Sequence, residues 1–225
     1  KKMYQKLLVL VLTYFYFYFL LALAYDPDPI QDFCIPNTRT TTTSRYNNFV
    51  SPCKNSKLVT PDDFVFPSVK SPGNNNFSDT GLASVSVSPS IFPGLNTLGM
   101  SFVHADLNIG GINPPHFHPR ATEITYVVRG KVYSGFVDSN NRVFSKVIEQ
   151  GMVMIFPKGL VHFMMNVGEN RATILGFFNS QNPGNMKIPA TIFGSGINDE
   201  LLEKAFGLSL KQIVVIRRKF FPKKT

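Results

Sequence analysis

A succession of short apolar runs separated by turn residues constrains the fold of this chain more than any other feature. The runs include EITYVVRG, KVYSGFV, RVFSKVIEQG, MVMIFPKG, LVHFMMNVGEN and RATILGFFN, between residues 123 and 179. Stretches rich in Val, Ile, Phe, Tyr and Thr that end at Gly, Asn or Pro are typical of β-strands and their turns. Their even spacing predicts an all-β fold, an antiparallel sandwich or barrel.

Length and composition agree with this prediction. A chain of 225 residues is long enough for one well-filled core. Phe is abundant with 21 residues, Trp is absent, and Gly and Pro number 16 each, which suits a β-rich protein with many turns. The basic residues do not interleave with aromatic residues on a recognisable module, so nucleic-acid binding is not expected.

The first 24 residues follow the order of a secretory signal peptide. Lys1, Lys2 and Lys6 precede an apolar run that ends in Ala22-Leu23-Ala24, so we predict a signal peptide at 1–24 and cleavage after Ala24. The alternative is a membrane anchor, because about 18 apolar residues approach spanning length. The polar YDPDP that follows, without a basic stop-transfer cluster, favours cleavage and no membrane association afterwards. Cleavage would leave 20 basic against 14 acidic residues, a formal net charge of +6 instead of +9.

Residues 25–60 are expected to form an irregular N-terminal arm around the two cysteines, Cys34 and Cys53. An exported chain would oxidise this pair, and a disulfide of that loop size stabilises by about 3 kcal/mol. A metal or redox cysteine pair would require closer spacing or a nearby histidine. Asn76 begins the sequon Asn-Phe-Ser in a polar loop, where a glycan would project into water.

The barrel is expected over 61–195, followed by a helical tail at 196–225. NDELLEKAFG begins with Asn198 or Asp199 as N-cap and ends at Gly207 as C-cap. SLKQIVVIRRKF begins with a capping box, Ser209 with Gln212. The apolar faces of these two helices need a surface to cover, either the barrel or a neighbouring subunit. The basic cluster at 217–224 is interpreted as a solvated helix end, and binding to anionic cell-wall polysaccharide is the alternative.

One stretch, NPPHFHPRATEITYVVRG, carries candidate metal ligands. Positions i and i+2 of a strand share a face, so His116 and His118 are expected to point the same way. The prolines on either side restrict the backbone at the strand entrance. Glu123 lies an odd number of residues from His118, so a bend near residues 119–121 is required to turn it toward them.

A second stretch, GMVMIFPKGLVHFMMN, carries a third histidine. Residues 157–159 are predicted to form a hairpin turn, with His162 on the next strand and Asn166 in phase with it. Three imidazoles and one carboxylate suit Mn, Fe, Ni, Cu or Zn. The alternative is that these are hydrogen-bonded core histidines. His104 has no such partner in the sequence and is interpreted as structural or as a surface residue.

The two stretches match paired motifs. The first motif, G-x5-HxH-x4-E-x6-G, is complete at Gly110, His116, His118, Glu123 and Gly130. The second, G-x5-PxG-x2-H-x3-N, is complete at Gly151, Pro157, Gly159, His162 and Asn166. Together with the segments DPDPIQDFC, PGLNTLG and FNSQNPG, these two motifs make the sequence resemble the germin and germin-like branch of the cupin superfamily over almost the whole mature chain.

The resemblance implies a cupin jelly-roll β-barrel in a secreted plant glycoprotein of the apoplast or cell wall. It implies manganese held by His116, His118, Glu123 and His162, with Asn113 and Asn166 as supporting residues. It further implies a homohexamer, a trimer of dimers with the C-terminal helices between subunits, and an intrachain disulfide at Cys34 and Cys53.

Three functions are compatible with the resemblance. The first is superoxide dismutase-type activity with a role in plant defence or stress. The second is oxalate oxidation, for which true germins use two asparagines; Asn113 matches one, but Val103 occupies the place of the other and cannot donate a hydrogen bond. The third is a non-enzymatic, metal-binding or receptor-like cell-wall protein. The zinc-binding, ER-retained auxin-binding cupin is disfavoured because the terminus FPKKT is not a KDEL-type signal.

Overall fold

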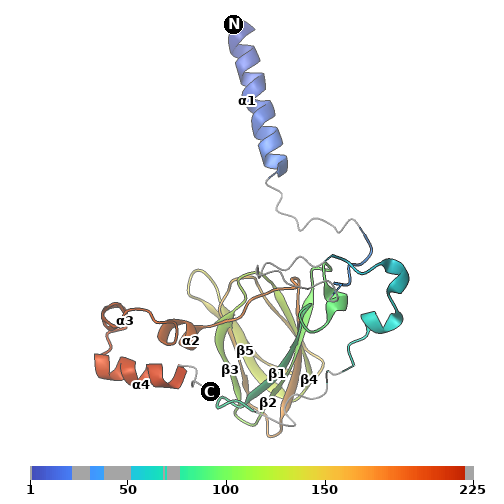
Figure 1. Ribbon diagram of the computed structural model, residues 1–225. Helices are drawn as coiled ribbons and strands as arrows, with labels where there is room; N and C mark the ends of the chain where they lie inside the picture. Colours follow the sequence, from blue (N-terminus) through green and yellow to red (C-terminus); the bar gives the residue numbers. More distant parts are fainter. Residues whose placement is uncertain (1, 22–30, 38–51, 68, 70–76, 221–225) are drawn as a thin grey trace, which may run out of the picture. The chain divides into compact units, whose positions relative to one another are not determined.

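The computed structural model describes residues 2–21, 31–37, 52–67, 69 and 77–220, which divide into two units, residues 1–32 and 33–225. In the described part of the second unit, ten strands form two five-stranded antiparallel sheets (Figure 1). The first sheet has the order β1-β2-β9-β4-β7 and the second β10-β3-β8-β5-β6. The strands are β1 (Leu82–Val87), β2 (Ser101–Leu107), β3 (Ile112–Phe117), β4 (Glu123–Arg129), β5 (Lys131–Val137), β6 (Val143–Glu149), β7 (Val153–Phe156), β8 (His162–Asn166), β9 (Ala172–Phe178) and β10 (Met186–Lys187).

Side-chain alternation explains how the sheets enclose a core. Along β4, Glu123, Thr125 and Val127 are buried, while the residues between them are exposed, the period of two expected of a strand with one wet face. The core contains Leu82, Ala105, Leu107, Val127, Val132, Ile148, Phe156, Met164, Ala172 and Ile174. The predicted all-β jelly-roll barrel with short C-terminal helices is therefore confirmed.

The turn at residues 157–159 differs from the prediction of a hairpin. β7 pairs with β4, whereas β8 pairs with β3 and β5, so this turn crosses from one sheet to the other. The segment between β3 and β4 crosses in the same way. A turn at Pro119 and Arg120 ends the β3 side of this crossing, within the bend predicted at residues 119–121. Because the two sheets face each other across the interior, Glu123 on β4 then faces the histidines.

The N-terminal part of the second unit is held by the predicted disulfide, which joins Cys34 to Cys53. Pro36 forms an isolated bridge with Cys53 beside it. Among the described residues, the 3-10 helices η2 (Ser56–Leu58) and η3 (Pro61–Phe64) follow, and η5 (Pro93–Leu95) lies between β1 and β2. The boundary between arm and barrel at residue 61 stays a prediction, and Asn76 lies outside the described residues.

Three helices close the chain and lie together beside the strands (Figure 1): α2 (Ile188–Phe193), α3 (Asp199–Phe206) and α4 (Leu210–Phe220). The capping predictions for α3 are confirmed, since the Asn198 side chain accepts a hydrogen bond from Leu201 N–H and Gly207 has a left-handed φ of 64°. Arg217 of α4 donates to the carbonyls of Phe193 and Ile197. α2 was not predicted, because its six residues are too few to show a helical period.

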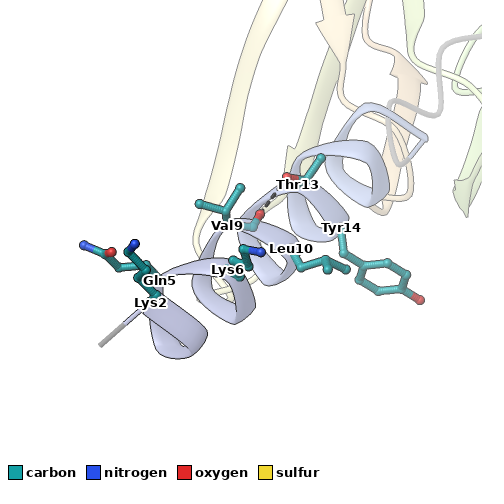
Figure 2. A pocket seen from close by; sticks show the side chains of 7 residues that line it. All are labelled: Lys2, Gln5, Lys6, Val9, Leu10, Thr13 and Tyr14. Atoms are coloured by element: carbon teal, nitrogen blue, oxygen red, sulfur yellow. Dashed lines mark hydrogen bonds between the residues drawn. The ribbon is translucent and has the colours of Figure 1, made fainter.

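The first unit contains α1 (Lys2–Leu21), and the predicted cleavage site after Ala24 lies outside the described residues. Figure 2 shows a shallow pocket along one side of this helix, where the Thr13 hydroxyl donates to the Val9 carbonyl at 2.6 Å. Its lining side chains recur at helical spacing and are Lys2, Gln5, Lys6, Val9, Leu10, Thr13 and Tyr14. Within the described residues, no helix combines the length and hydropathy that a membrane span requires.

Candidate metal centre

The four predicted ligands converge inside the barrel. His116 lies on β3, His118 follows this strand directly, and Glu123 and His162 open β4 and β8. One potential ligand atom from each lies within 4.8 Å of the other three. All four side chains are buried, with at most 5% of the residue surface exposed, so the cluster is an interior site.

A β-bulge sets the position of His116. Asn113 pairs with Met164 and His116 pairs with His162, so β3 contains one more residue than β8 over this interval. The additional residue falls at Pro114-Pro115. A residue in a bulge does not donate its backbone N–H to the neighbouring strand, so proline, which has no such N–H, is tolerated there. As a result, the His116 and His162 rings meet across the two strands, with centroids 4.1 Å apart.

Backbone carbonyls fix the protonation of the three imidazoles. Each Nδ1 lies at hydrogen-bonding distance from one carbonyl oxygen: His116 from Pro114 at 2.9 Å, His118 from Gly184 at 2.5 Å and His162 from Leu160 at 2.9 Å. A carbonyl only accepts, so each Nδ1 carries the proton in the neutral ring. Each Nε2 then presents a lone pair, which is the form in which histidine binds metals.

The carboxylate completes the set. Glu123 Oε2 lies 3.1 Å from His118 Nε2 and 3.2 Å from His162 Nε2. These three atoms are buried and have no hydrogen-bond partner, a costly arrangement that a bound cation would relieve. Three imidazole nitrogens and one carboxylate oxygen are a donor set for a divalent transition metal. The residues present therefore fit a metal ion.

Burial and the close packing of these groups shift two pKa values. Desolvation, together with the neighbouring His162, lowers the pKa of His116 from 6.5 to about 3. Burial alone would raise the pKa of Glu123, but its contacts with His118 and His162 outweigh burial and lower it from 4.5 to about 2. At neutral pH, His116 is therefore neutral and Glu123 is ionised, as metal binding requires.

A cavity of about 620 Å³ leads from three of these ligands to the surface. Val103, Asn113 and Lys187 line it, and Lys187 is exposed. The Asn113 side-chain nitrogen is 3.3 Å from His116 Nε2, and its side-chain oxygen is buried without a partner. Asn113 thus reaches the space in front of the ligands, as expected.

Asn166 has a different role from the expected one. It is buried as predicted, but its side-chain nitrogen donates to backbone carbonyls, and its side-chain oxygen accepts from Gly168 N–H. The three carbonyls belong to Leu107, Asn108 and Asn170. Asn166 therefore ties the turns that follow β2 and β8 together, instead of supporting the metal ligands.

The sequence did not reveal three residues that hold the ligands in place. Thr125 donates to Glu123 Oε1 at 2.8 Å, and its position two residues after Glu123 on one strand face was the available signal. The Gly184 carbonyl accepts a hydrogen bond from His118. Arg120 holds the same loop, because its guanidinium donates to the backbone carbonyl of Asn182 at 2.6 Å and to the side-chain oxygen of Asn182 at 2.8 Å. No short-range pattern links these loops to His118, which lies 66 residues from Gly184.

His104 is separate from this cluster. It lies on β2 with its Nε2 3.9 Å from Asp106 Oδ1. Ala105 and Leu107, which alternate with His104 and Asp106, belong to the core, so this pair faces the opposite side of the sheet. Of the two interpretations of His104, as a structural or as a surface residue, its partly buried position agrees with the structural one.

Comparisons with known proteins support the motif assignment. The profile of the cupin family matches residues 68–213. The chain is 62% identical over 200 residues to germin-like protein subfamily 3 member 2 of Arabidopsis thaliana, covering 88% of this chain and 86% of the relative. It is 52% identical over 202 residues to germin-like protein 2-4 of Oryza sativa subsp. japonica, covering 88% and 87%. A solved structure of oxalate oxidase in complex with the substrate analogue glycolate is 38% identical, with a TM-score of 0.77, covering 87% of this chain and 98% of that chain.

Proposed function

This chain belongs to the germin-like proteins of the cupin family, and from that premise we propose that it is a secreted, manganese-binding protein of the apoplast and cell wall with superoxide dismutase-type activity. The observation that carries the proposal is the convergence of three unprotonated imidazole nitrogens and one carboxylate on a common point. A role in plant defence or stress would follow from peroxide formation outside the cell.

Manganese is proposed because four protein donors suit an ion that prefers six. His116, His118, Glu123 and His162 would hold it, and a tetrahedral zinc ion would already be saturated by them. A bound manganese ion would supply one-electron exchange between two oxidation states. The protein's own contribution is to direct the three Nε2 lone pairs into the site through the carbonyls that bind each Nδ1. The lowered pKa values of His116 and Glu123 keep that ring neutral and the carboxylate ionised.

The cavity suits a small anion. Superoxide requires no dedicated carboxylate-binding groups, and the wall beside the ligands includes the apolar Val103 and Met164. Lys187 lines the cavity and is exposed, and a cation in a cleft raises the local concentration of anionic substrate.

Oxalate oxidation is not proposed, although a structural neighbour is an oxalate oxidase. Val103 lies in the cavity wall and offers no hydrogen bond to a second carboxylate. An unpaired carboxylate in a partly apolar wall carries a large desolvation cost. The cavity therefore supports a diatomic anion better than a dicarboxylate.

Two assays on one metal-loaded preparation test the proposal. We expect superoxide dismutation that is lost in the His116→Ala, His118→Ala double variant, and no peroxide release from oxalate. Val103→Asn is assayed beside the unmodified protein, because it places a hydrogen-bond donor in the cavity wall. Peroxide release from oxalate by the unmodified protein would overturn the argument from Val103. Bound manganese without activity in either assay would leave the non-enzymatic, metal-binding function.

We propose that the protein is a homo-oligomer, a hexamer built as a trimer of dimers. The support is an apolar outer face on the first sheet, where large side chains on β4, β7 and β9 are exposed: Ile124, Tyr126, Val128, Val153, Ile155 and Phe177. A patch of this kind marks an interaction surface in a soluble protein. Analytical ultracentrifugation tests this proposal, and a Val153→Glu, Ile155→Glu variant should sediment as smaller species.

Secretion and glycosylation remain part of the proposal. Two features support export. Residues 1–24 have the succession of basic, apolar and small residues of a signal peptide, and the disulfide between Cys34 and Cys53 is of a kind that persists in oxidising compartments. Mass spectrometry of the protein purified from the extracellular fluid would show cleavage after Ala24 and the occupancy of Asn76. An intracellular protein with an intact N-terminus would overturn this part.

A further inference from the structure

We propose that Thr125 and Gly176 are positioning residues that hold Glu123 so that it offers only Oε2 to the metal. This inference rests on the proposed metal binding and adds residues to the site that the ligand motifs do not contain. It depends on the surroundings of the other carboxylate oxygen, Oε1.

Thr125 occupies one side of Oε1. Its hydroxyl donates to Glu123 Oε1 at 2.8 Å, and the residue is fully buried with 0% exposure. A hydrogen bond to an ionised acceptor inside a protein is stronger than one between neutral groups. A tilt of the carboxylate that turned both of its oxygens toward the imidazoles would break this bond and leave the hydroxyl donor buried and unpaired, which is costly.

Gly176 also lies next to Oε1. It pairs with Thr125 on β4 and with Val103 on β2, so it sits between the two strands that flank the site. A Cβ atom built at Gly176 would lie closer than 3.0 Å to Glu123 Oε1 and 2.9 Å from Val103 Cγ1. Any side chain here would push the carboxylate out of its position, so the absence of a side chain makes room for Oε1.

The two contacts divide the roles of the carboxylate oxygens. Oε1 is held by the Thr125 hydroxyl and enclosed by the Gly176 backbone, while Oε2 lies 3.1 and 3.2 Å from two imidazole nitrogens. The protein therefore supplies four donor atoms instead of five. On an ion that prefers six, this leaves one more position for water or substrate than a carboxylate bound through both oxygens would.

The Thr125 hydroxyl is not required by the strand itself. Valine has the same branched shape and an equally high preference for strands, so Thr125→Val removes the hydrogen bond and keeps the volume. Thr125→Ser keeps the hydroxyl and removes a methyl group. A purely structural role would make valine the milder change, whereas a positioning role makes serine the milder one.

The experiment measures manganese affinity by chelator competition and the electron paramagnetic resonance spectrum of bound Mn²⁺. We expect Thr125→Val to weaken binding about 10- to 100-fold, the usual effect of losing a group that orients a ligand, and to change the zero-field splitting. Thr125→Ser should restore most of both. The melting temperature of each metal-free variant reports folding separately.

Thr173→Val is the matched control. Thr173 donates to Asp106 Oδ1 at 2.7 Å, so the variant removes the same kind of hydrogen bond from a buried carboxylate that is not a ligand. It should leave affinity and spectrum as in the unmodified protein.

The outcomes separate this inference from the proposed function. If the unmodified protein binds no metal, both fail. If the unmodified protein binds manganese and Thr125→Val matches it in affinity and spectrum, the positioning role alone is overturned. The positioning role is also overturned if Thr125→Ser is impaired as strongly as Thr125→Val, or if Thr173→Val produces an equal loss.

Discussion

Two buried carboxylates in this barrel each accept a hydrogen bond from a threonine hydroxyl, but their other surroundings differ. Glu123 accepts a hydrogen bond from Thr125 at 2.8 Å, and Asp106 accepts one from Thr173 at 2.7 Å. Neither is exposed by more than 3%. Glu123 belongs to the inward-facing set of β4, whereas Asp106 alternates with core residues on β2 and faces the other side of the sheet.

The difference lies in the imidazoles around each carboxylate. His118 and His162 turn Nε2 toward Glu123 at 3.1 and 3.2 Å, and His116 completes the cluster. Near Asp106, the corresponding atom of His104 is 3.9 Å away. Within the described residues, only the Glu123 set gathers three or more potential ligand atoms. A buried carboxylate becomes a metal site when several lone pairs converge on it, and burial by itself is not sufficient.

The largest expected difference is between variants that remove the negative charge of Glu123 and of Asp106. Glu123→Gln should weaken manganese binding by more than about 100-fold, because a direct ligand contributes more than the groups that orient ligands. Asp106→Asn should leave the affinity within about threefold of the unmodified protein, since the distant change should not couple to the site. Elemental analysis and chelator competition measure both. Loss of the ion from Asp106→Asn would contradict the division between the two carboxylates.

A smaller but still large effect is expected at the glycine beneath Glu123. Gly176→Ala places a Cβ closer than 3.0 Å to Oε1, so we expect manganese affinity to fall by about 10- to 100-fold as the carboxylate is displaced. Gly168→Ala is the control, because a Cβ atom added at Gly168 would come no closer than 3.4 Å to its nearest neighbours, one of which is the Asn166 side-chain oxygen. Competition titrations of both variants provide the measurement, and normal affinity in Gly176→Ala would show that Oε1 is not confined there.

Acid is expected to lower the folding stability of the metal-free protein through the groups around Glu123. The pKa of His116 is lowered from 6.5 to about 3, so the unfolded chain takes up a proton first and stability falls as pH drops between these values. The lowered pKa of Glu123, from 4.5 to about 2, acts in the same direction between its own limits. The metal-free protein should melt about 5 to 10 °C lower at pH 4.5 than at pH 7.

His116→Leu isolates the histidine part of this pH dependence. The variant removes the group whose pKa is lowered by burial, so the melting temperature of the metal-free protein should change less between pH 7 and pH 4.5. Differential scanning calorimetry at the two pH values gives the result. An equally steep change in His116→Leu would assign the pH dependence to other groups.

The smallest effect is expected at His104. His104→Gln keeps a polar side chain of similar reach, so we expect manganese content to stay unchanged and the melting temperature to shift by less than about 3 °C. Elemental analysis and a thermal melt would detect a departure. A reduced metal content would mean that the Asp106 side of the sheet supports the site.

The ligands could be predicted from the sequence because their signals are local. His116 and His118 are separated by one residue, a spacing that predicts side chains on the same side of an extended segment, and His162 follows a Pro-Lys-Gly turn. The caps of the tail were predictable for the same reason, since Asn198 and Gly207 act on the helix that they flank.

Other features were hidden because they depend on contacts between distant segments. The turn at 157–159 joins two sheets, although a hairpin has the same residues. Asn166 matches the phase of His162 but binds backbone carbonyls of the turns near it in space. Gly184 reaches His118 across 66 residues of sequence, a distance over which no periodic pattern is informative.

The sequence by itself determined the strand pattern, the four residues of the candidate metal site and the pairing of the two cysteines. Alternation, motif spacing and the presence of one cysteine pair are properties of the chain. Only the tertiary structure decided which ring nitrogens carry lone pairs, which oxygen of Glu123 faces them and which carboxylate stands outside the site. The physical reason is that protonation and orientation are set by neighbours such as Gly184, Thr125 and Gly176, which approach the ligands only once the two sheets close on each other.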